Sequence, residues 1–309
     1  MSAMLLRSLL PLLCATTLFA QQAPIDSIDV QRDLPYAGTD NPRQQLDLFL
    51  PARRADEQPL PIIVFIHGGG WQKGDKAGGL RQVASYVQSG RYAGVSVGYR
   101  LSGEARWPAQ VYDCKAAIRW IRAHAAEHRL DPARIGVWGA SAGGHLVSLL
   151  GTSGDVKELE GDLGPNTGVS SRVTCVVNFF GPENFMTMLR PGAQGTATGA
   201  IGALFGGPLS EKAADAKAAS PVTHISADDP PFFTAHGTKD PLVPFAQAQE
   251  LDAALVKAGV PHLLMQMTDA GHGFRSAELD RRIAQFFDLH LRGVKSDIAT
   301  TPIAVEARQ

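Results

Sequence analysis

Cysteine is scarce in this sequence, which limits what can hold the fold together. The 309 residues contain three cysteines, and the first of them falls within the first twenty residues. The other two, Cys114 and Cys175, are too few for a disulfide framework and too far apart for a metal-binding motif. We expect both to be buried as small hydrophobic side chains, with a single bridge between them as the alternative.

An excess of charge of either sign is also lacking. Lysine and arginine number 29, aspartate and glutamate number 30, and the formal net charge is −1. No block of basic residues interrupts this balance, so the chain has no electrostatic surface for a polyanion and we expect no nucleic-acid partner. Hydrophobic residues make up 44% of the chain, which is enough for one large core and one catalytic domain.

The motifs of metal and nucleotide enzymes are missing as well. The sequence contains neither the H-E-x-x-H nor the C-x-x-C pattern of metal sites. It also has no phosphate-binding G-x-x-x-x-G-K-[ST] and no dinucleotide-binding G-x-G-x-x-G after a first strand. We therefore expect chemistry that needs no metal and no cofactor.

No apolar run reaches the roughly 18 to 20 residues that a membrane-spanning helix needs. A shorter run at residues 9–19 follows Arg7 and ends at Ala20, before the polar Gln21. This pattern is typical of a signal peptide, with a permanent anchor as the alternative. It predicts that residues 1–20 are removed and that the mature protein is secreted or periplasmic, without stable membrane insertion.

Apolar, β-branched runs alternate with segments of helical period along most of the chain. The predicted strands lie at 44–50, 62–66, 93–99, 134–138, 173–180, 231–235 and 262–267, and the predicted helices at 108–128, 142–150, 245–258 and 277–291. The first strand alternates apolar and polar residues, which favours a place near a sheet edge, whereas the others are almost wholly apolar. The alternation predicts an α/β fold with a mainly parallel central sheet and helices on both faces.

Two segments depart from this rhythm. Residues 183–226 are rich in glycine, alanine and proline and contain a helix candidate at 210–219, and we expect a small lid or substrate loop there. Residues 296–309 show no periodicity and are expected to form a flexible tail. The catalytic domain is therefore predicted to span residues 21–295.

A Gly-Ala-Ser-Ala-Gly pentapeptide follows the predicted strand at 134–138 and opens the next helix, with Ser141 at its centre. Strand, sharp turn and helix are the setting of a nucleophile elbow, in which the serine hydroxyl stands over the carboxyl edge of the sheet. This motif predicts the α/β-hydrolase fold and Ser141 as a catalytic nucleophile.

A serine hydroxyl needs a base, and the base needs an acid that orients it. Asp240 lies in a turn-rich loop after the strand at 231–235, and His272 follows the strand at 262–267. The order serine, acid, histidine is that of α/β-hydrolases. We therefore predict a catalytic triad of Ser141, Asp240 and His272.

The glycine run His-Gly-Gly-Gly-Trp at residues 67–71 directly follows another strand. Backbone amides in such a run can approach the oxyanion of a tetrahedral intermediate. We predict that Gly69 and Gly70 donate to it together with Ala142, and that His67 braces the loop.

Three segments together resemble a known group: residues 67–71, the passage from Tyr99 to Asp113, and residues 135–145. They are similar to the bifunctional feruloyl and acetyl xylan esterase branch of the α/β-hydrolases, which is related to the hormone-sensitive-lipase-like esterases. Over residues 30–291 the resemblance implies the same triad and oxyanion loop, and small acyl or aryl esters of plant polysaccharide as substrates. The broad family also includes formamidases and esterases of lipids and polyesters.

The predicted reaction is ester hydrolysis through an acyl-enzyme, on a small-molecule or polysaccharide-linked ester. Trp71, Tyr99 and Trp107 are candidates for substrate binding, with Phe205 as a further aromatic residue. General carboxylesterase, lipase or polyester hydrolase activity, amidase, peptidase or formamidase activity, and a non-catalytic binding role remain alternatives.

Overall fold

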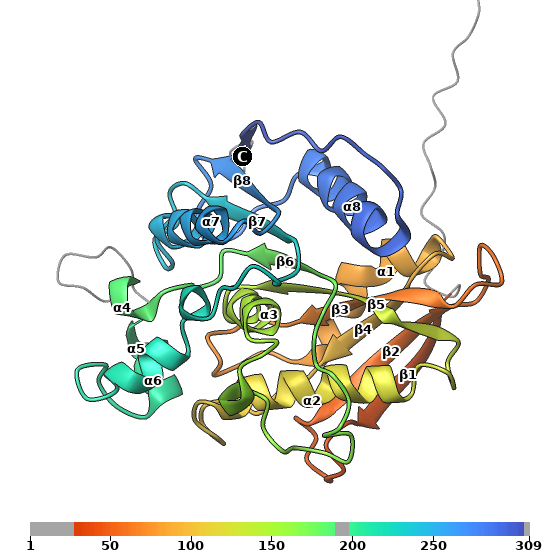
Figure 1. Cartoon of the computed structure of the whole chain (residues 1–309), viewed down its shortest axis with the longest axis horizontal. Coiled ribbons are helices and arrows are strands. Elements are labelled where there is room, and N and C mark those ends of the chain that lie inside the picture. The colour runs from red at the N-terminus through yellow and green to blue at the C-terminus, as the bar shows by residue number, and fades with distance from the viewer. Residues whose placement is uncertain (1–27, 189–197, 306–309) are drawn as a thin grey trace, which may run out of the picture.

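The computed structural model describes residues 28–188 and 198–305, and within them a nine-stranded sheet forms the centre of the molecule (Figure 1). The strand order is β1-β2-β4-β3-β5-β6-β7-β8-β9. The strands are β1 (Ile28–Pro35), β2 (Gln45–Pro51), β3 (Leu60–Ile66), β4 (Ala93–Val97), β5 (Leu130–Ala140), β6 (Cys175–Phe179), β7 (Phe232–Gly237), β8 (His262–Thr268) and β9 (Ile303–Ala304). The predicted signal peptide lies outside the described residues.

Most of the sheet is parallel, as its apolar strands predict. All pairings from β4 to β9 are parallel, whereas β2 pairs antiparallel with both β1 and β4. The predicted strand at 44–50 is therefore close to the edge, but β1 covers it and was not predicted. β1 carries charged and partly exposed residues, so its pattern is too weak to indicate a strand by itself.

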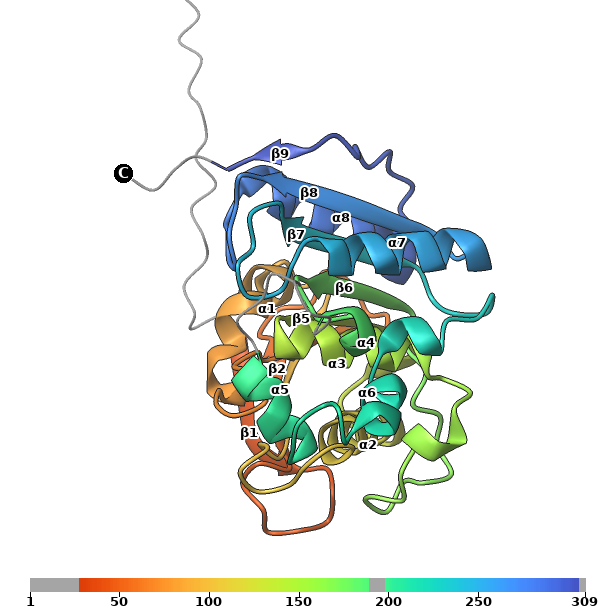
Figure 2. The same cartoon turned by 90° about the vertical axis from the view of Figure 1, so that its left-hand side faces the viewer.

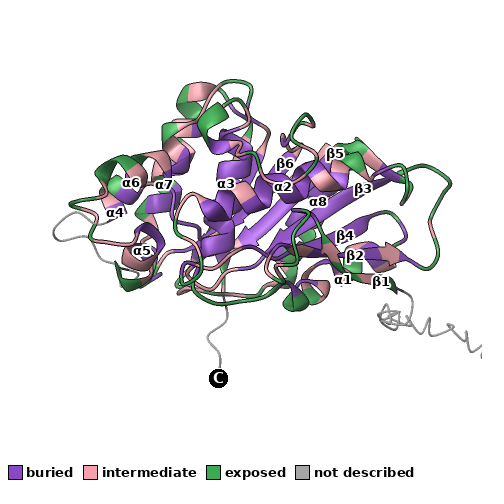
Figure 3. Cartoon of the chain, turned by 90° about the horizontal axis from the view of Figure 1, so that it is seen from below, coloured by how far each residue is buried: buried purple, intermediate pink, exposed green. Residues whose placement is uncertain are grey.

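Helices cover both faces of the sheet, as expected, and the sheet separates two hydrophobic cores. On β3, Ile62, Val64 and Ile66 face one core while Ile63 and Phe65 face the other. Helices α2 (Ala109–Ala123), α3 (Ala142–Thr152) and α7 (Ala246–Ala258) contribute to the first core, and α1 (Leu80–Gln88) and α8 (Ala277–Arg292) to the second. Figure 3 shows the central strands and α3 as the most deeply buried elements.

The two free cysteines lie on opposite sides of the sheet, because Cys114 belongs to the first core and Cys175 to the second. Both are buried, as predicted from their apolar surroundings. The sheet between them excludes the alternative of a disulfide bridge.

The segment at 183–226 forms short helices at one end of the molecule (Figures 1 and 2). These are α4 (Phe185–Met188), α5 (Thr198–Phe205), α6 (Ala213–Ala218) and the 3-10 turn η4 (Pro221–Thr223). Two further 3-10 turns, η2 (Lys76–Gly78) and η3 (Lys157–Leu159), lie in loops elsewhere. Helix α6 corresponds to the predicted candidate at 210–219, whereas α5 was not predicted.

The C-terminal tail, which was predicted to be flexible from residue 296 onward, contains a short strand in its described part. Residues 303 and 304 form β9 and pair in parallel with β8. Arg282 on α8 donates to the Thr301 carbonyl at 2.7 Å, and Ile303 is 7% exposed. Two paired residues are too few to produce a periodic pattern, which is why the sequence gives no sign of this strand.

Candidate active site

Ser141 lies at the sharp turn between β5 and α3, with φ 56° and ψ −120°. This left-handed backbone is costly for a residue with a side chain and is typical of strained functional turns. The flanking glycines are required: a Cβ at Gly139 would lie 2.2 Å from the Gly143 carbonyl oxygen, and one at Gly143 would lie 2.1 Å from that of Ile66. The Ser141 amide donates to the Phe179 carbonyl at 2.8 Å, so β6 holds the turn in place.

The three side chains predicted as a triad form one hydrogen-bonded chain. His272 Nε2 lies 2.9 Å from Ser141 Oγ, and His272 Nδ1 lies 2.7 Å from Asp240 Oδ2. Ser141 follows β5, Asp240 follows β7 and His272 follows β8, so the parallel sheet brings their carboxyl ends to one edge. With its hydrogen on Nδ1, the imidazole presents a free Nε2 that can accept the Ser141 proton.

Several hydrogen-bond donors hold the carboxylate of Asp240 in place. Asp240 Oδ1 accepts hydrogen bonds from the amides of Leu242 at 2.8 Å and Val243 at 2.9 Å. Burial by itself raises the pKa of Asp240, but hydrogen bonds from His236, His272 and the Val243 amide outweigh it and hold the pKa below its ordinary value. The carboxylate therefore stays ionised at neutral pH, as an orienting acid must.

His236 also lies beside Asp240, and the sequence did not lead us to assign it a role. The side chain is fully buried. Its Nε2 lies 2.8 Å from the Val243 carbonyl oxygen and 3.4 Å from Asp240 Oδ2. It therefore supports the turn that carries the carboxylate. The only signal in the sequence is its position four residues before Asp240.

Phe180 is a second residue that sequence reasoning missed. Its φ of 40° is unusual for a bulky residue, and its ring lies 4.6 Å from that of His272, inclined at 60°. It is 8% exposed and also packs against Phe274. This packing restricts the orientation of the imidazole between Ser141 and Asp240.

The glycine run approaches Ser141 closely. A Cβ at Gly68 would lie 3.4 Å from the Ser141 Cβ and 2.6 Å from the Ala140 carbonyl oxygen, so only glycine fits there. Gly69 and Gly70 have positive φ angles of 111° and 61°. The loop and cap hydrogen bonds of residues 28–188 and 198–305 do not use the amides of Gly69, Gly70 or Ala142, which leaves these donors available to a ligand.

His67 braces the start of this loop in the way the sequence predicted. Its Nδ1 lies 2.8 Å from the Gly68 carbonyl oxygen, and its ring stacks on Tyr99 at 4.3 Å. Tyr99 in turn donates from its hydroxyl to the His67 carbonyl at 3.0 Å. Burial lowers the pKa of His67, which favours the neutral ring.

The side chains of Trp71 and Tyr99, which were predicted to bind substrate, are buried in the structure. Trp71 is 2% exposed and Tyr99 is 0% exposed, so neither ring is open to a ligand in this structure. Both rings have partners inside the protein: Tyr99 stacks on His67, and Trp71 donates a hydrogen bond to His145. Trp107 is partly exposed and remains a candidate, whereas Phe205 is 3% exposed and packs against it.

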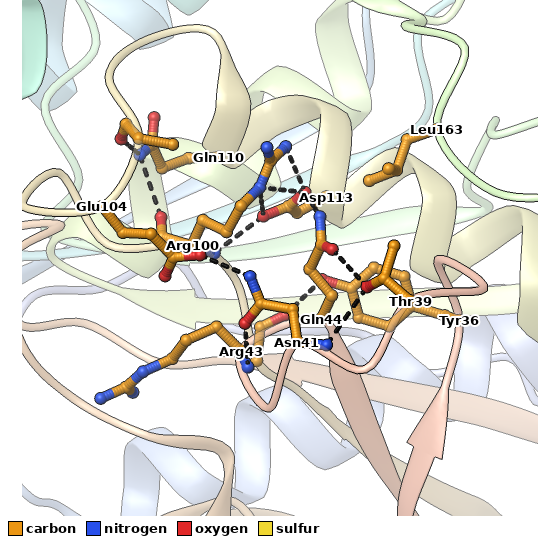
Figure 4. A network of polar contacts seen from close by, with 12 residues as sticks. Tyr36, Thr39, Asn41, Arg43, Gln44, Arg100, Glu104, Gln110, Asp113 and Leu163 are labelled. Atoms are coloured by element: carbon orange, nitrogen blue, oxygen red, sulfur yellow. Dashed lines mark hydrogen bonds and ion pairs between the residues drawn. The ribbon is translucent and has the colours of Figure 1, made fainter.

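A polar network holds the loop that leads to Trp107 (Figure 4). Asp113 on α2 accepts from the Arg100 backbone amide at 2.7 Å and from the Arg100 guanidinium at 2.8 to 3.1 Å. Gln44 donates to the same carboxylate at 2.9 Å, and Gln110 donates to the Arg100 and Ala105 carbonyls. The network gives a structural reason for the arginine and aspartate in the passage from Tyr99 to Asp113.

The insertion at 183–226 lies against the glycine run. A Cβ at Gly70 would lie 3.2 Å from the Ala200 Cβ on α5, and the Trp107 amide donates to the Leu204 carbonyl at 2.9 Å. The described part of the insertion therefore borders the site, as a lid or substrate loop would. Residues 189–197 lie outside the described part.

Within the described ranges no three histidine, cysteine, aspartate or glutamate side chains gather as a metal site requires. The same ranges contain no helix that is both long and apolar enough to cross a membrane.

A family model described as BD-FAE matches residues 46–255, which is more than half of the chain. The chain belongs to the BD-FAE family. The matched segment holds Ser141 and Asp240 and ends before His272. Together with the sheet topology and the similar structures given below, this match shows the α/β-hydrolase fold.

Known proteins similar to the BD-FAE chain include two from Mycobacterium tuberculosis. Esterase LipQ is 30% identical over 246 residues, covering 78% of this chain and 56% of that protein. The probable carboxylic ester hydrolase LipM is 36% identical over 191 residues, covering 61% of this chain and 43% of that protein. The chain thus spans about half the length of these curated relatives.

Solved structures similar to the BD-FAE chain include one described as a truncated form of carbohydrate esterase from gut microbiota. It has a TM-score of 0.81 and 29% identity, with 88% of this chain and 100% of that chain covered. A bifunctional GH43-CE protein of Bacteroides eggerthii has a TM-score of 0.77 and 33% identity, with 85% and 35% covered. These likenesses support the α/β-hydrolase fold derived from the strands.

Proposed function

We propose that the protein is a serine carboxylic ester hydrolase that works through an acyl-enzyme, with Ser141 as nucleophile, His272 as base and Asp240 as orienting acid. The observation that carries this proposal is the hydrogen-bonded chain of the three side chains, with distances of 2.9 and 2.7 Å. Its members come from three different strand ends, and each is in the position that proton transfer requires.

In the first step, His272 Nε2 takes the Ser141 proton while Oγ attacks the ester carbonyl. Asp240 holds the hydrogen on Nδ1 and stabilises the imidazolium that forms. The protonated imidazole then delivers the proton to the departing alcohol, and an acyl-enzyme remains on Ser141. Water repeats the attack with His272 as base, which releases the acid and restores the serine.

The tetrahedral intermediates carry a negative oxygen that needs fixed donors. The amides of Gly69, Gly70 and Ala142 are the donors that we assign to it, because Ala142 directly follows Ser141, the glycine run reaches Ser141 at Gly68, and the loop and cap hydrogen bonds of the described residues do not use these amides. Ala142 is also the first residue of α3, where the helix dipole favours negative charge. Removing one such donor in a serine hydrolase costs about 3 to 4 kcal/mol of transition-state stabilisation.

Short acyl or feruloyl esters of plant polysaccharide are the substrates that we propose. The two similar structures are described as a carbohydrate esterase and a GH43-CE protein, which supports a carbohydrate-linked ester. Trp107 is a partly exposed aromatic side chain that could stack on a sugar or an aryl ring.

We propose further that residues 1–20 direct export, so that the mature protein meets polymer-derived esters in the periplasm or outside the cell. The support is the charged start, apolar run and small residue at 20 in the sequence. N-terminal sequencing of the protein recovered from a host with a secretion pathway tests this, since an uncleaved N-terminus in the cytoplasm contradicts it.

The test of the activity is a substrate panel measured with wild type, Ser141→Ala and the exposed-serine control Ser89→Ala. The panel contains p-nitrophenyl esters from acetate to long chains, methyl ferulate, acetylated xylan and an anilide. We expect wild type and the control to hydrolyse the short or feruloyl esters, with Ser141→Ala inactive.

Other outcomes would redirect or overturn the proposal. A preference for long-chain esters would contradict the polysaccharide substrate and indicate a general carboxylesterase, lipase or polyester hydrolase. Turnover of the anilide alone would indicate an amidase. Equal inactivity of wild type and Ser141→Ala on every member would remove the enzymatic role and leave a binding function.

A further inference from the structure

His145 is a fully buried histidine that the proposed reaction does not use. It lies on α3, one turn after Ser141, and its backbone amide donates to the Ser141 carbonyl at 3.0 Å. Its ring lies outside the hydrogen-bonded chain of Ser141, His272 and Asp240. A polar ring at a 0% exposed position must satisfy both nitrogens internally, so its partners show what it does.

The two partners define one tautomer of this ring. The Trp71 indole nitrogen can only donate, and it lies 3.3 Å from His145 Nδ1, so Nδ1 must be an acceptor. The hydrogen is then on Nε2, which donates to the Ala219 carbonyl oxygen at 2.7 Å. A protonated ring would place two N–H groups against each other at Trp71, and burial lowers the pKa of His145 to about 4, so the ring is neutral at neutral pH.

Trp71 is the residue through which this hydrogen bond reaches the glycine run. It directly follows Gly70 and has a φ of 56°, which is strained for a residue with a large side chain. Its carbonyl accepts from the Ser102 amide at 2.8 Å, and its ring meets that of His145 edge-on at 5.4 Å. The indole N–H bond thus holds the Trp71 side chain, while backbone hydrogen bonds to the Trp71 and Gly69 carbonyls hold the main chain at the end of the loop.

The other partner belongs to the insertion. Ala219 is the C-terminal cap of α6, and the His145 ring also packs against Phe185 on α4 at 5.1 Å. The His145 ring therefore links α3, the helix that follows the nucleophile, to two other parts of the protein. These are Trp71 at the end of the glycine run and the segment at 183–226.

We propose that His145 is a positioning residue, which accepts the Trp71 indole hydrogen and thereby holds the Gly69 and Gly70 amides at the distance from Ser141 that the oxyanion requires. The inference rests on the proposed esterase function of the same site. The oxyanion donors act in the transition state, so loss of the hydrogen bond between His145 and Trp71 should lower kcat with little change in KM.

The experiment compares His145→Leu, which removes both hydrogen bonds, with His145→Asn, whose side-chain oxygen can replace Nδ1 as the acceptor for Trp71. We expect kcat on p-nitrophenyl acetate to fall about 10- to 100-fold in His145→Leu, with KM changed less than about threefold. The asparagine variant should recover most of this loss. Thr152→Val, a change at another buried polar residue of α3, is the control and should keep the wild-type kcat.

Trp71→Phe tests the same hydrogen bond from its other end and serves if the leucine variant does not fold. It should lower kcat as His145→Leu does, and the double variant should be no slower than His145→Leu alone, because both single variants remove the same hydrogen bond between Trp71 and His145. Wild-type kcat in either single variant, or losses that multiply in the double variant, would overturn the proposal.

Nitrogen NMR of the histidine rings separates this inference from the activity itself. We expect a His145 ring with a hydrogen on Nε2 and a bare Nδ1, whereas a hydrogen on Nδ1 would overturn the proposal whatever the activity. If wild type and Ser141→Ala are equally inactive, the esterase function fails, while the tautomer still tests the contact. If wild type is active and His145→Leu matches it, the positioning role alone fails.

Discussion

Asp240→Asn is the substitution whose effect can be worked out most fully from the structure. The two backbone amides of Leu242 and Val243 point at Oδ1, so the asparagine oxygen must occupy that position. Its NH2 group then takes the place of Oδ2, 2.7 Å from His272 Nδ1. A donor at this point forces the imidazole hydrogen onto Nε2, where it faces Ser141 and can no longer accept the serine proton.

The expected loss is large because the variant keeps its shape but has the wrong tautomer. The same change in a serine triad lowers kcat about 10⁴-fold, which corresponds to about 5 kcal/mol in the barrier. KM should stay within about threefold of wild type, since no substrate contact is removed. Steady-state hydrolysis of p-nitrophenyl acetate at neutral pH measures both constants.

Asp269→Asn is the matched control for this experiment. Asp269 is exposed, pairs with Lys239 at 2.7 Å and lies three residues before His272. Its amide variant should keep kcat within about twofold, because exposed ion pairs contribute little. If Asp240→Asn retained more than a tenth of the wild-type kcat while folded, the tautomer argument and the assignment of Asp240 would both be refuted.

Three further predictions concern the loop, a buried acid and the tail. Gly70→Ala should lower kcat about tenfold, since its φ is 61° and its Cβ would press on α5, whereas Gly78→Ala, with open space around it, should not. Burial raises the pKa of Asp229 to about 6, so the folded state binds its proton more tightly than the unfolded chain and stability falls as pH rises from about 4 to 6. Asp229→Asn should therefore raise the free energy of unfolding at pH 8 by on the order of 1 to 3 kcal/mol and much less at pH 4, measured by urea denaturation. Deleting residues 302–309 should lower Tm by roughly 4 to 10 °C through the loss of buried Ile303, with kcat within about twofold; an unchanged Tm would contradict the role of β9.

The sequence predicts the triad well because each member is tied to the end of a strongly apolar strand. Ser141, Asp240 and His272 follow β5, β7 and β8, and parallel strands place such ends at one edge. Their hydrogen-bonded contact then follows from the sheet and needs no knowledge of the loops. Strands such as β3 and β7 are buried on both faces, and their composition differs most from that of loops. β8 is less buried, but it is still rich in apolar residues.

The elements that were missed depend on packing rather than on local pattern. Helix α5 has the sequence Thr-Gly-Ala-Ile-Gly-Ala-Leu-Phe, in which each glycine disfavours a helix by about 1 kcal/mol. It is formed where Ile201, Leu204 and Phe205 are buried in the core, and the sequence does not show that contact. The exposure of Trp71 and Tyr99 could not be predicted for the same reason, because their partners are 74 and 32 residues away.

The distance along the chain between the site residues has a consequence for folding. The hydrogen bond between Ser141 and His272 joins residues 131 positions apart, and β6 and β7 lie between β5 and β8 in the sheet. Contacts of such separation form late, because the entropy of closing the intervening chain must be overcome first. During synthesis, the nucleophile turn emerges from the ribosome long before its base does. Recovery of esterase activity on refolding should therefore report the docking of the last long parallel strand rather than the collapse of the core.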